Sequence, residues 1–188
     1  MKIYLAGPEV FLPDAREILD KKIALTLAHG FTPVAPGDLK VAQTLSGREK
    51  GLAISAHNEA LMLSADIIIA NLTPYRGVSA DVGTVYELGF MCARGCPAYA
   101  FTNVTDGLFE RTSTWYGGDV REDAHGQQRG TDGLMLENCG FVDNLMLDGG
   151  IESRNGAVIR HEASPEQLYT DLTAFEACLA IAARQLLS

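Results

Sequence analysis

Residues 66–71 read Asp66-Ile67-Ile68-Ile69-Ala70-Asn71, an apolar run with a polar residue at each end. A strand that is apolar on both faces is typical of a parallel sheet with helices on each side, because neither face meets water. Further short apolar runs predict strands at 2–6, 31–35, 97–101 and 157–160. Together they predict a five-stranded parallel sheet.

Helical patterns fill the intervals between these strands. Apolar residues recur at helical spacing in residues 13–29, 48–64, 84–94 and 164–187, and Gly30 and Gly95 follow two of these segments as helix stops. Ser164-Pro165-x-Gln167 has the pattern of a capped helix start. Strands that alternate with helices predict an α/β fold of flavodoxin-like order 2-1-3-4-5, with helices on both faces. Its ligand site is expected at the carboxyl ends of the strands.

Two segments are expected to lack regular structure. Pro36-Gly37-Asp38 predicts a turn that closes the second strand. Residues 104–135 are polar and Gly-rich and predict a long irregular excursion, a candidate lid. We expect residues 1–188 to form a single domain that carries this excursion.

Charge and composition narrow the classes of partner. The chain has 15 Lys and Arg against 24 Asp and Glu, a net charge of −9. Such a surface repels phosphate backbones and anionic lipid, so we expect neither a nucleic-acid nor a membrane partner. The cysteines and histidines lack the spacing of a metal or redox motif, so we expect no metal and no cofactor. The N-terminus lacks the layout of a signal peptide, and the expected location is the cytoplasm.

The turn after the first strand differs from the usual phosphate-binding loops. The chain has neither a Gly-x-Gly-x-x-Gly nor a Walker-type motif. Gly7-Pro8-Glu9-Val10-Phe11 instead predicts a carboxylate and an aromatic ring where a phosphate would lie. This pattern favours an uncharged ligand with a flat apolar part over a nucleotide phosphate.

The densest polar cluster is Asp81-Val82-Gly83-Thr84-Val85-Tyr86-Glu87, and it supports two interpretations. Thr84 and Glu87 have the spacing of a capping box, in which Glu87 only binds the backbone at the helix start. Alternatively, Glu87 is an oriented nucleophile, and Asp81 is a second acid that handles a proton.

Two further polar positions are also ambiguous. Asn58, in His57-Asn58-Glu59, is either solvated helix surface or a partner for a sugar hydroxyl. Asn144 interrupts the apolar run 140–147, where a polar residue either caps a turn or reaches a ligand.

The motifs taken in order resemble the nucleoside 2-deoxyribosyltransferase family, especially its protozoal-like branch. The resemblance covers residues 2 to about 147. It is carried by Ile3-Tyr-Leu-Ala-Gly-Pro-Glu-Val-Phe-Leu-Pro-Asp14, by Asn58, by Ala65 to Asn71, by Thr73-Pro-Tyr-Arg-Gly77, by Asp81-x-Gly-Thr-x-x-Glu87-x-Gly89 and by Asn144-Leu-Met146.

The resemblance implies a role for each matching residue. The catalytic group would be Glu87 as the nucleophile that attacks C1′, Tyr4 hydrogen-bonded to it, and Asp81 moving a proton on the base. Substrate-binding residues would be Phe11 stacked on the base, Asn58 on the sugar, Gly83 in the same loop, and Asn144 and Met146 from a partner subunit. The implied assembly is a homo-oligomer with shared sites, either a dimer or a hexamer built as a trimer of dimers. Two features depart from the family pattern: some members carry Asp where Asn58 stands, and the stretch 104–135 is longer than usual.

The expected function is transfer of 2-deoxyribose from a 2′-deoxynucleoside to a free nucleobase, in nucleotide salvage, with slow hydrolysis as a side reaction. This chemistry needs no metal or organic cofactor. One alternative is a hydrolase that cleaves (deoxy)nucleosides or deoxynucleoside 5′-monophosphates. Another is a non-enzymatic nucleoside-binding module, which would not require the Asp81/Glu87 pair.

Overall fold

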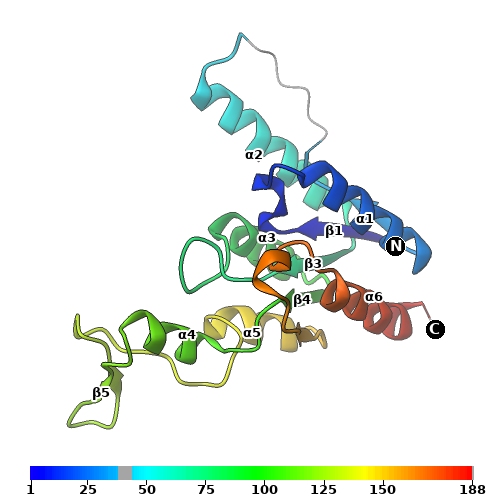
Figure 1. Ribbon diagram of the computed structural model, residues 1–188. Coiled ribbons are helices and arrows are strands. Elements are labelled where there is room, and N and C mark those ends of the chain that lie inside the picture. Colours follow the sequence, from blue (N-terminus) through cyan, green and yellow to red (C-terminus); the bar gives the residue numbers. More distant parts are fainter. Residues whose placement is uncertain (38–43, 188) are drawn as a thin grey trace.

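The computed structural model describes residues 1–37 and 44–187 and contains a five-stranded parallel sheet (Figure 1). The strand order is β2-β1-β3-β4-β7, so the predicted flavodoxin-like order and fold class are confirmed. Asp38, the last residue of the predicted turn after the second strand, lies outside the described residues. The strands are β1 (Lys2–Ala6), β2 (Thr32–Val34), β3 (Ile67–Asn71), β4 (Ala98–Thr102) and β7 (Val158–Arg160).

The helices agree with the sequence patterns to within a few residues, with two exceptions. The last helix begins later than predicted, and two helices within residues 104–152 were not predicted. Ser46 and Glu49 form a reciprocal capping box at the start of the second helix. Gly30 and Gly95 adopt φ values of 85° and 76°, as expected of glycines that end helices. The helices are α1 (Ala15–Ala28), α2 (Gly47–Ser64), α3 (Val82–Ala93), α4 (Leu108–Trp115), α5 (Leu145–Glu152) and α6 (Thr173–Leu186), with 3₁₀ turns at Pro8–Phe11 and Pro165–Gln167.

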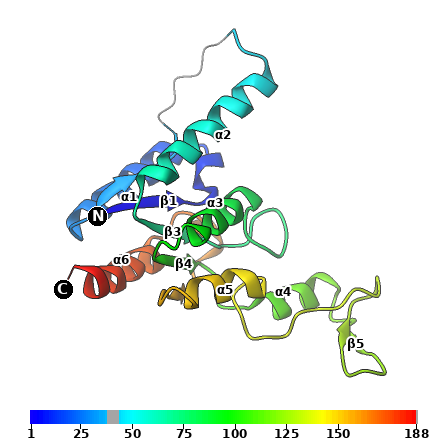
Figure 2. The same ribbon diagram turned by 180° about the vertical axis from the view of Figure 1, so that it is seen from behind.

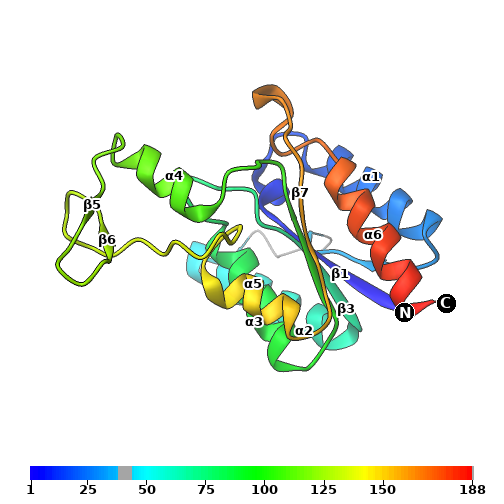
Figure 3. The ribbon, with the colours of Figure 1, turned by 90° about the horizontal axis from the view of Figure 1, so that it is seen from below.

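Helices cover both faces of the sheet (Figures 2 and 3). Successive strand residues point to opposite faces, so each strand contributes to two cores. Ile3, Ile69 and Phe101 pack with α1 and α6 on one face. Tyr4 and Ile68 pack with α2, α3 and α5 on the other. The alternation thereby directs the Tyr4 side chain toward α3.

The last helix begins later than the sequence pattern predicts. The Ser164 side chain makes no capping hydrogen bond, and Pro165–Gln167 form only a 3₁₀ turn. Asn103, at the end of β4, donates to the carbonyl oxygen of Asp171 (3.0 Å), and the Asp171 carboxylate accepts from the Thr173 amide (2.8 Å). Because tertiary contacts hold this segment, regular helix starts only at Thr173.

Residues 104–135 are not irregular throughout, as the composition suggested. They contain α4 and a short antiparallel hairpin of β5 (Arg121–Glu122) and β6 (Gln128–Arg129). Helix and hairpin together form an arm that extends away from the sheet (Figures 1 and 3). Trp115 is 70% exposed on it, so the arm presents apolar surface to its surroundings.

Two further observations concern the whole described chain. Cys92, Cys96 and Cys178 are buried free thiols, and Cys139 is an exposed one. Within residues 1–37 and 44–187, no helix combines the length and the apolar character needed to cross a membrane.

Candidate functional site

A cavity of about 250 Å³ opens at the carboxyl edge of the sheet, where the first turn, α2 and the start of α3 meet. Five of the residues that the sequence analysis selected line this one cavity, although they are widely spaced in the chain. The described lining residues are Gly7, Val10, Phe11, Pro36, Gly37, Ile54, Asn58, Asp81, Gly83, Thr84 and Glu87.

Glu87 lies half-buried on α3 and is held from the sheet by Tyr4. The Tyr4 hydroxyl donates to Glu87 Oε1 at 2.6 Å. Tyr4 itself is fully buried in β1. Because its aromatic ring is fixed in the core, the hydroxyl restrains one carboxylate oxygen of Glu87 while the side chain lines the cavity.

The surroundings of Glu87 raise its pKa to about 7. Loss of water around the carboxyl is the largest cause, and the nearby charge of Asp81 adds to it. The Tyr4 hydrogen bond and the positive charge of Lys22 act in the opposite direction. Burial raises the pKa of the Tyr4 hydroxyl, and the contact with Glu87 adds to this rise. Glu87 therefore changes its charge near neutral pH.

The capping-box interpretation of Glu87 is wrong. Asp81, not Thr84, is the N-cap of α3, and its Oδ2 accepts from the Thr84 amide (2.9 Å) and hydroxyl (3.1 Å). Glu87 thus lies beyond the first turn of the helix, where neither the backbone amides nor the helix dipole stabilises its anion. The amides and the dipole of the helix start therefore act on Asp81 and not on Glu87.

Phe11 belongs to an aromatic stack at the edge of the cavity. Its ring lies on Tyr75 with centroids 5.4 Å apart and an interplanar angle of 19°. The Arg76 guanidinium lies over both rings, 4.8 Å from the Tyr75 centroid and 5.9 Å from that of Phe11. Phe11 is nevertheless 58% exposed, so this supported ring retains surface for a flat ligand.

Asn58 lies between this cavity and a neighbouring groove. The groove, also of about 250 Å³, runs between α2 and α3 and shares Asn58, Ile54, Gly83 and Glu87 with the cavity. On its far side the Tyr86 hydroxyl donates to the Glu59 carboxylate. The sequence analysis did not identify Ile54 or Glu59 as lining residues, because contacts between α2 and α3 bring them to the groove.

Asn144 and Met146 do not belong to the lining of this cavity in the described part of the chain. Asn144 caps α5, because its Oδ1 accepts from the Met146 amide (3.1 Å), while its Nδ2 donates to Glu137 (2.8 Å). The Met146 side chain is 71% exposed. Within one chain, Asn144 thus has the capping role that was one of the two interpretations.

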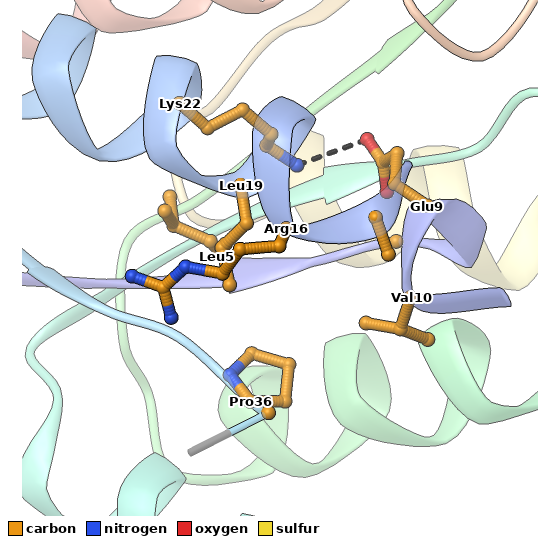
Figure 4. A pocket seen from close by; sticks show the side chains of 10 residues that line it. Leu5, Glu9, Val10, Arg16, Leu19, Lys22 and Pro36 are labelled. Atoms are coloured by element: carbon orange, nitrogen blue, oxygen red, sulfur yellow. Dashed lines mark hydrogen bonds and ion pairs between the residues drawn. The ribbon is translucent and has the colours of Figure 1, made fainter. Parts of the chain in front are cut away.

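The carboxylate of Glu9 does not lie where the sequence pattern predicted. It is buried beneath the first turn, where its Oε1 accepts from Lys22 Nζ at 3.0 Å and from Asn71 Nδ2 at 2.9 Å. Figure 4 shows this ion pair at the side of a second cavity, of about 230 Å³, between the turn and α1. Because Lys22 neutralises it, Glu9 gives no electrostatic argument against a phosphate in the main cavity.

The arrangement suits nucleophilic chemistry. A restrained carboxylate, a second carboxylate at a helix start and an exposed aromatic ring converge on one cavity. Within the described residues, no group of three or more His, Cys, Asp or Glu side chains is placed to hold a metal ion.

Known proteins resemble this chain in both sequence and fold. The sequence pattern of the nucleoside 2-deoxyribosyltransferase family matches residues 3–146. An uncharacterized protein of Schizosaccharomyces pombe is 34% identical over 171 residues, covering 83% of this chain and 79% of its own. A solved 2-desoxiribosyltransferase from Leishmania mexicana is 28% identical, with a TM-score of 0.65 and 98% of each chain covered. A conserved protein from Enterococcus faecalis V583, 19% identical, covers 90% of this chain and 96% of its own at a TM-score of 0.55, a likeness of fold alone.

Proposed function

Because the chain belongs to the nucleoside 2-deoxyribosyltransferase family, we propose that it transfers 2-deoxyribose from a 2′-deoxynucleoside to a second nucleobase. The observation that carries this proposal is the Glu87 carboxylate, which lines the cavity and is held by Tyr4. A nucleophile must be oriented before it can attack, and a hydrogen bond from a core residue supplies that orientation.

In the first step, one oxygen of Glu87 attacks C1′ and forms an ester as the bond between C1′ and the base nitrogen breaks. Tyr4 holds Oε1, so Oε2 is the attacking oxygen. The electron pair of the broken bond stays on the base, which takes up a proton that Asp81 delivers. Positive charge develops on the sugar as the base departs, and the Glu87 carboxylate neutralises this charge when it forms the ester.

In the second step, a new base enters beside the exposed Phe11 ring and attacks C1′ from the face that the first base left. Asp81 accepts the proton lost by the incoming base, and Glu87 returns to its starting form. Two inversions give net retention at C1′. Asn58 and Gly83 line the same cavity, and we assign them to the sugar. Water that reaches the ester gives slow hydrolysis.

The decisive experiment incubates the protein with a 2′-deoxynucleoside, with and without a second free base, and separates the products by chromatography. Transfer predicts a new deoxynucleoside only when the second base is present. A hydrolase would release base and free deoxyribose at the same rate in both mixtures, and a binding module would release neither. A parallel reaction with the 5′-monophosphate tests the nucleotide alternative.

We expect the activity to rise with pH through an acid limb near the pKa of Glu87, about 7. Below that pH the carboxyl is protonated and cannot attack. Tyr4→Phe removes a hydrogen bond that lowers this pKa, so its acid limb should move to higher pH. The measurement is the pH profile of kcat/KM for both proteins. An unchanged limb in Tyr4→Phe would show that another group controls the profile.

We also expect the functional unit to be a homo-oligomer, a dimer or a trimer of dimers, with Asn144 and Met146 reaching a neighbour's cavity. Two observations support this arrangement. Leu145 and Met146 are 41% and 71% exposed beside Asn144, and Ile54 at the cavity is 45% exposed. Exposed apolar side chains at both places are what an interface beside a ligand site needs.

A mixing experiment tests the shared site. Glu87→Ala and Asn144→Ala oligomers should each be nearly inactive, whereas co-refolded hybrids should regain part of the activity. Some sites in a hybrid pair an intact Glu87 with an intact Asn144 from the other chain. If native mass spectrometry detects hybrids and their activity stays at background, Asn144 does not act across subunits.

A further inference from the structure

The buried ion pair of Glu9 and Lys22 takes no part in the proposed chemistry, yet it lies next to the cavity. The side chains of Lys22 and Glu9 are 3% and 7% exposed. The Lys22 ammonium lies 5.6 and 5.0 Å from the ring centroids of Phe101 and Phe175 in the core. Moving two charges out of water is unfavourable, and replacing a buried ion pair by apolar residues of similar size often leaves a protein equally stable. Stability alone therefore does not account for this pair.

The pair connects three segments that meet at the carboxyl edge of the sheet. Glu9 belongs to the first turn, Lys22 to α1, and Asn71, the second donor to Glu9, to the end of β3. Asn71 also accepts from the Thr73 amide at 2.9 Å. This bond orients the segment that carries Tyr75, the ring beneath Phe11. The Glu9 carboxylate is therefore linked to both rings of the aromatic stack, to Phe11 through the first turn and to Tyr75 through Asn71.

Gly7 shows how closely the carboxylate packs under the turn. A Cβ added at Gly7 would lie 1.9 Å from Glu9 Oε2 and 3.0 Å from the Asn71 Cβ. Gly7 and Val10 line both the main cavity and the cavity beside α1 shown in Figure 4. The turn is thus a thin wall between two cavities, and the ion pair anchors it from below.

We propose that the Glu9–Lys22 pair positions this wall and holds Val10 and Phe11 where the nucleobase binds. The identity of the ligand rests on the proposed function, whereas the anchoring role does not. Glu9 and Lys22 are positioning residues, since neither touches the reacting atoms.

The charged groups around Glu87 determine the direction of the electrostatic effect. Tyr4 contacts Glu87 from β1, and Asp81 lies at the start of α3. Glu59, bound to Tyr86, lines the adjoining groove, and Lys22 on α1 is paired with Glu9. Of these, Tyr4 and Lys22 lower the pKa of Glu87, and Asp81 raises it. Removing the Lys22 charge should therefore raise this pKa and leave a smaller fraction of Glu87 ionised near neutral pH.

The informative variant is the double replacement Glu9→Gln/Lys22→Met, which removes both charges and keeps the side-chain volumes. Either single change leaves one buried charge without its charged partner, whereas the double change leaves no buried charge. We expect KM for the deoxynucleoside to rise about tenfold with a smaller change in kcat, because binding surface is lost. Because Lys22, and not Glu9, is among the charges that act on Glu87, the acid limb of kcat/KM should move to higher pH.

Two control variants separate positioning from general destabilisation. Lys21→Met removes a neighbouring lysine on α1 that pairs with Glu17 at the surface, and it should leave KM and the limb unchanged. Leu179→Ala opens a hole in the same core layer, so it should lower Tm without moving the limb. A double variant that behaves like Leu179→Ala would overturn the proposal.

Two measurements without substrate keep the inference separate from the proposed function. Amide hydrogen exchange of residues 7–11 should be faster in the double variant, and to a lesser degree in Glu9→Gln, which keeps an acceptor for both donors. Carbon-13 NMR should give a higher titration midpoint for the Glu87 carboxyl in the double variant. If the wild type does not transfer deoxyribose, the proposed function fails while both measurements still apply. Wild-type exchange and an unshifted midpoint would refute the positioning role even in an active transferase.

Discussion

A Glu87→Gln protein should lose transfer activity by at least about a thousandfold while it stays folded. Gln keeps an oxygen for the Tyr4 hydroxyl, which donates to Glu87 at 2.6 Å in the wild type. It cannot form the sugar ester, however, so the first step is lost. Glu176→Gln, a change of the same kind at an exposed position on α6, is the matched control and should retain full activity. A folded Glu87→Gln protein with wild-type turnover would remove Glu87 from the mechanism.

The stability of the same variant gives an independent check. The pKa of Glu87 rises from an ordinary 4.5 to about 7 in the folded protein. Between these pH values the unfolded chain ionises while the folded one holds its proton, so the unfolding free energy falls as pH rises. Above pH 7 the full loss amounts to about 3 kcal/mol for a wholly realised shift.

Glu87→Gln lacks this titration, so it should match the wild type near pH 4 and exceed it in stability at pH 8. Urea unfolding of both proteins at the two pH values measures the difference. A variant that is less stable at pH 8 would show that the carboxylate is well solvated or paired in the folded state. Mass spectrometry of the wild type, given a deoxynucleoside and no acceptor, should in addition detect a 2-deoxyribosyl adduct on the peptide with Glu87.

Ribonucleosides should react at least about 100-fold more slowly than 2′-deoxynucleosides. A 2′-hydroxyl withdraws electrons and destabilises the cationic sugar, and it would also crowd the carboxylate that attacks the neighbouring carbon. Glu87, Asn58 and Gly83 line both the cavity and its adjoining groove, and we expect the sugar and its extra hydroxyl to bind beside them.

The test compares kcat/KM for inosine and 2′-deoxyinosine with the same acceptor base. Both donors carry the same base, so contacts with Phe11 cancel and the ratio reports on the sugar alone. A ratio near one would refute selection at the sugar. Base release from both donors at equal rates, with no acceptor dependence, would favour the hydrolase alternative as well.

Local patterns were sufficient for most of the architecture. The run 67–69 is apolar on both faces, and Gly30 and Gly95 adopt the positive φ that ends a helix, so strands and helices could be predicted close to their bounds. The alternation of these elements leaves few topologies, and the order 2-1-3-4-5 was among them. The predicted start of the last helix was wrong because Asn103, which is distant in sequence, holds the segment before Thr173 by a hydrogen bond to Asp171.

The sequence by itself was enough to select Tyr4, Phe11, Asn58, Asp81 and Glu87 as candidates for the chemistry, because they lie in motifs that resemble the family. Their protonation and their partners were decided only by the tertiary structure. Glu87 titrates near pH 7 because packing removes its water, and Glu9 is neutralised because α1 brings Lys22 beneath the first turn. Desolvation and ion pairing depend on distances between segments far apart in the chain, and such distances exist only once the sheet and its helices have packed.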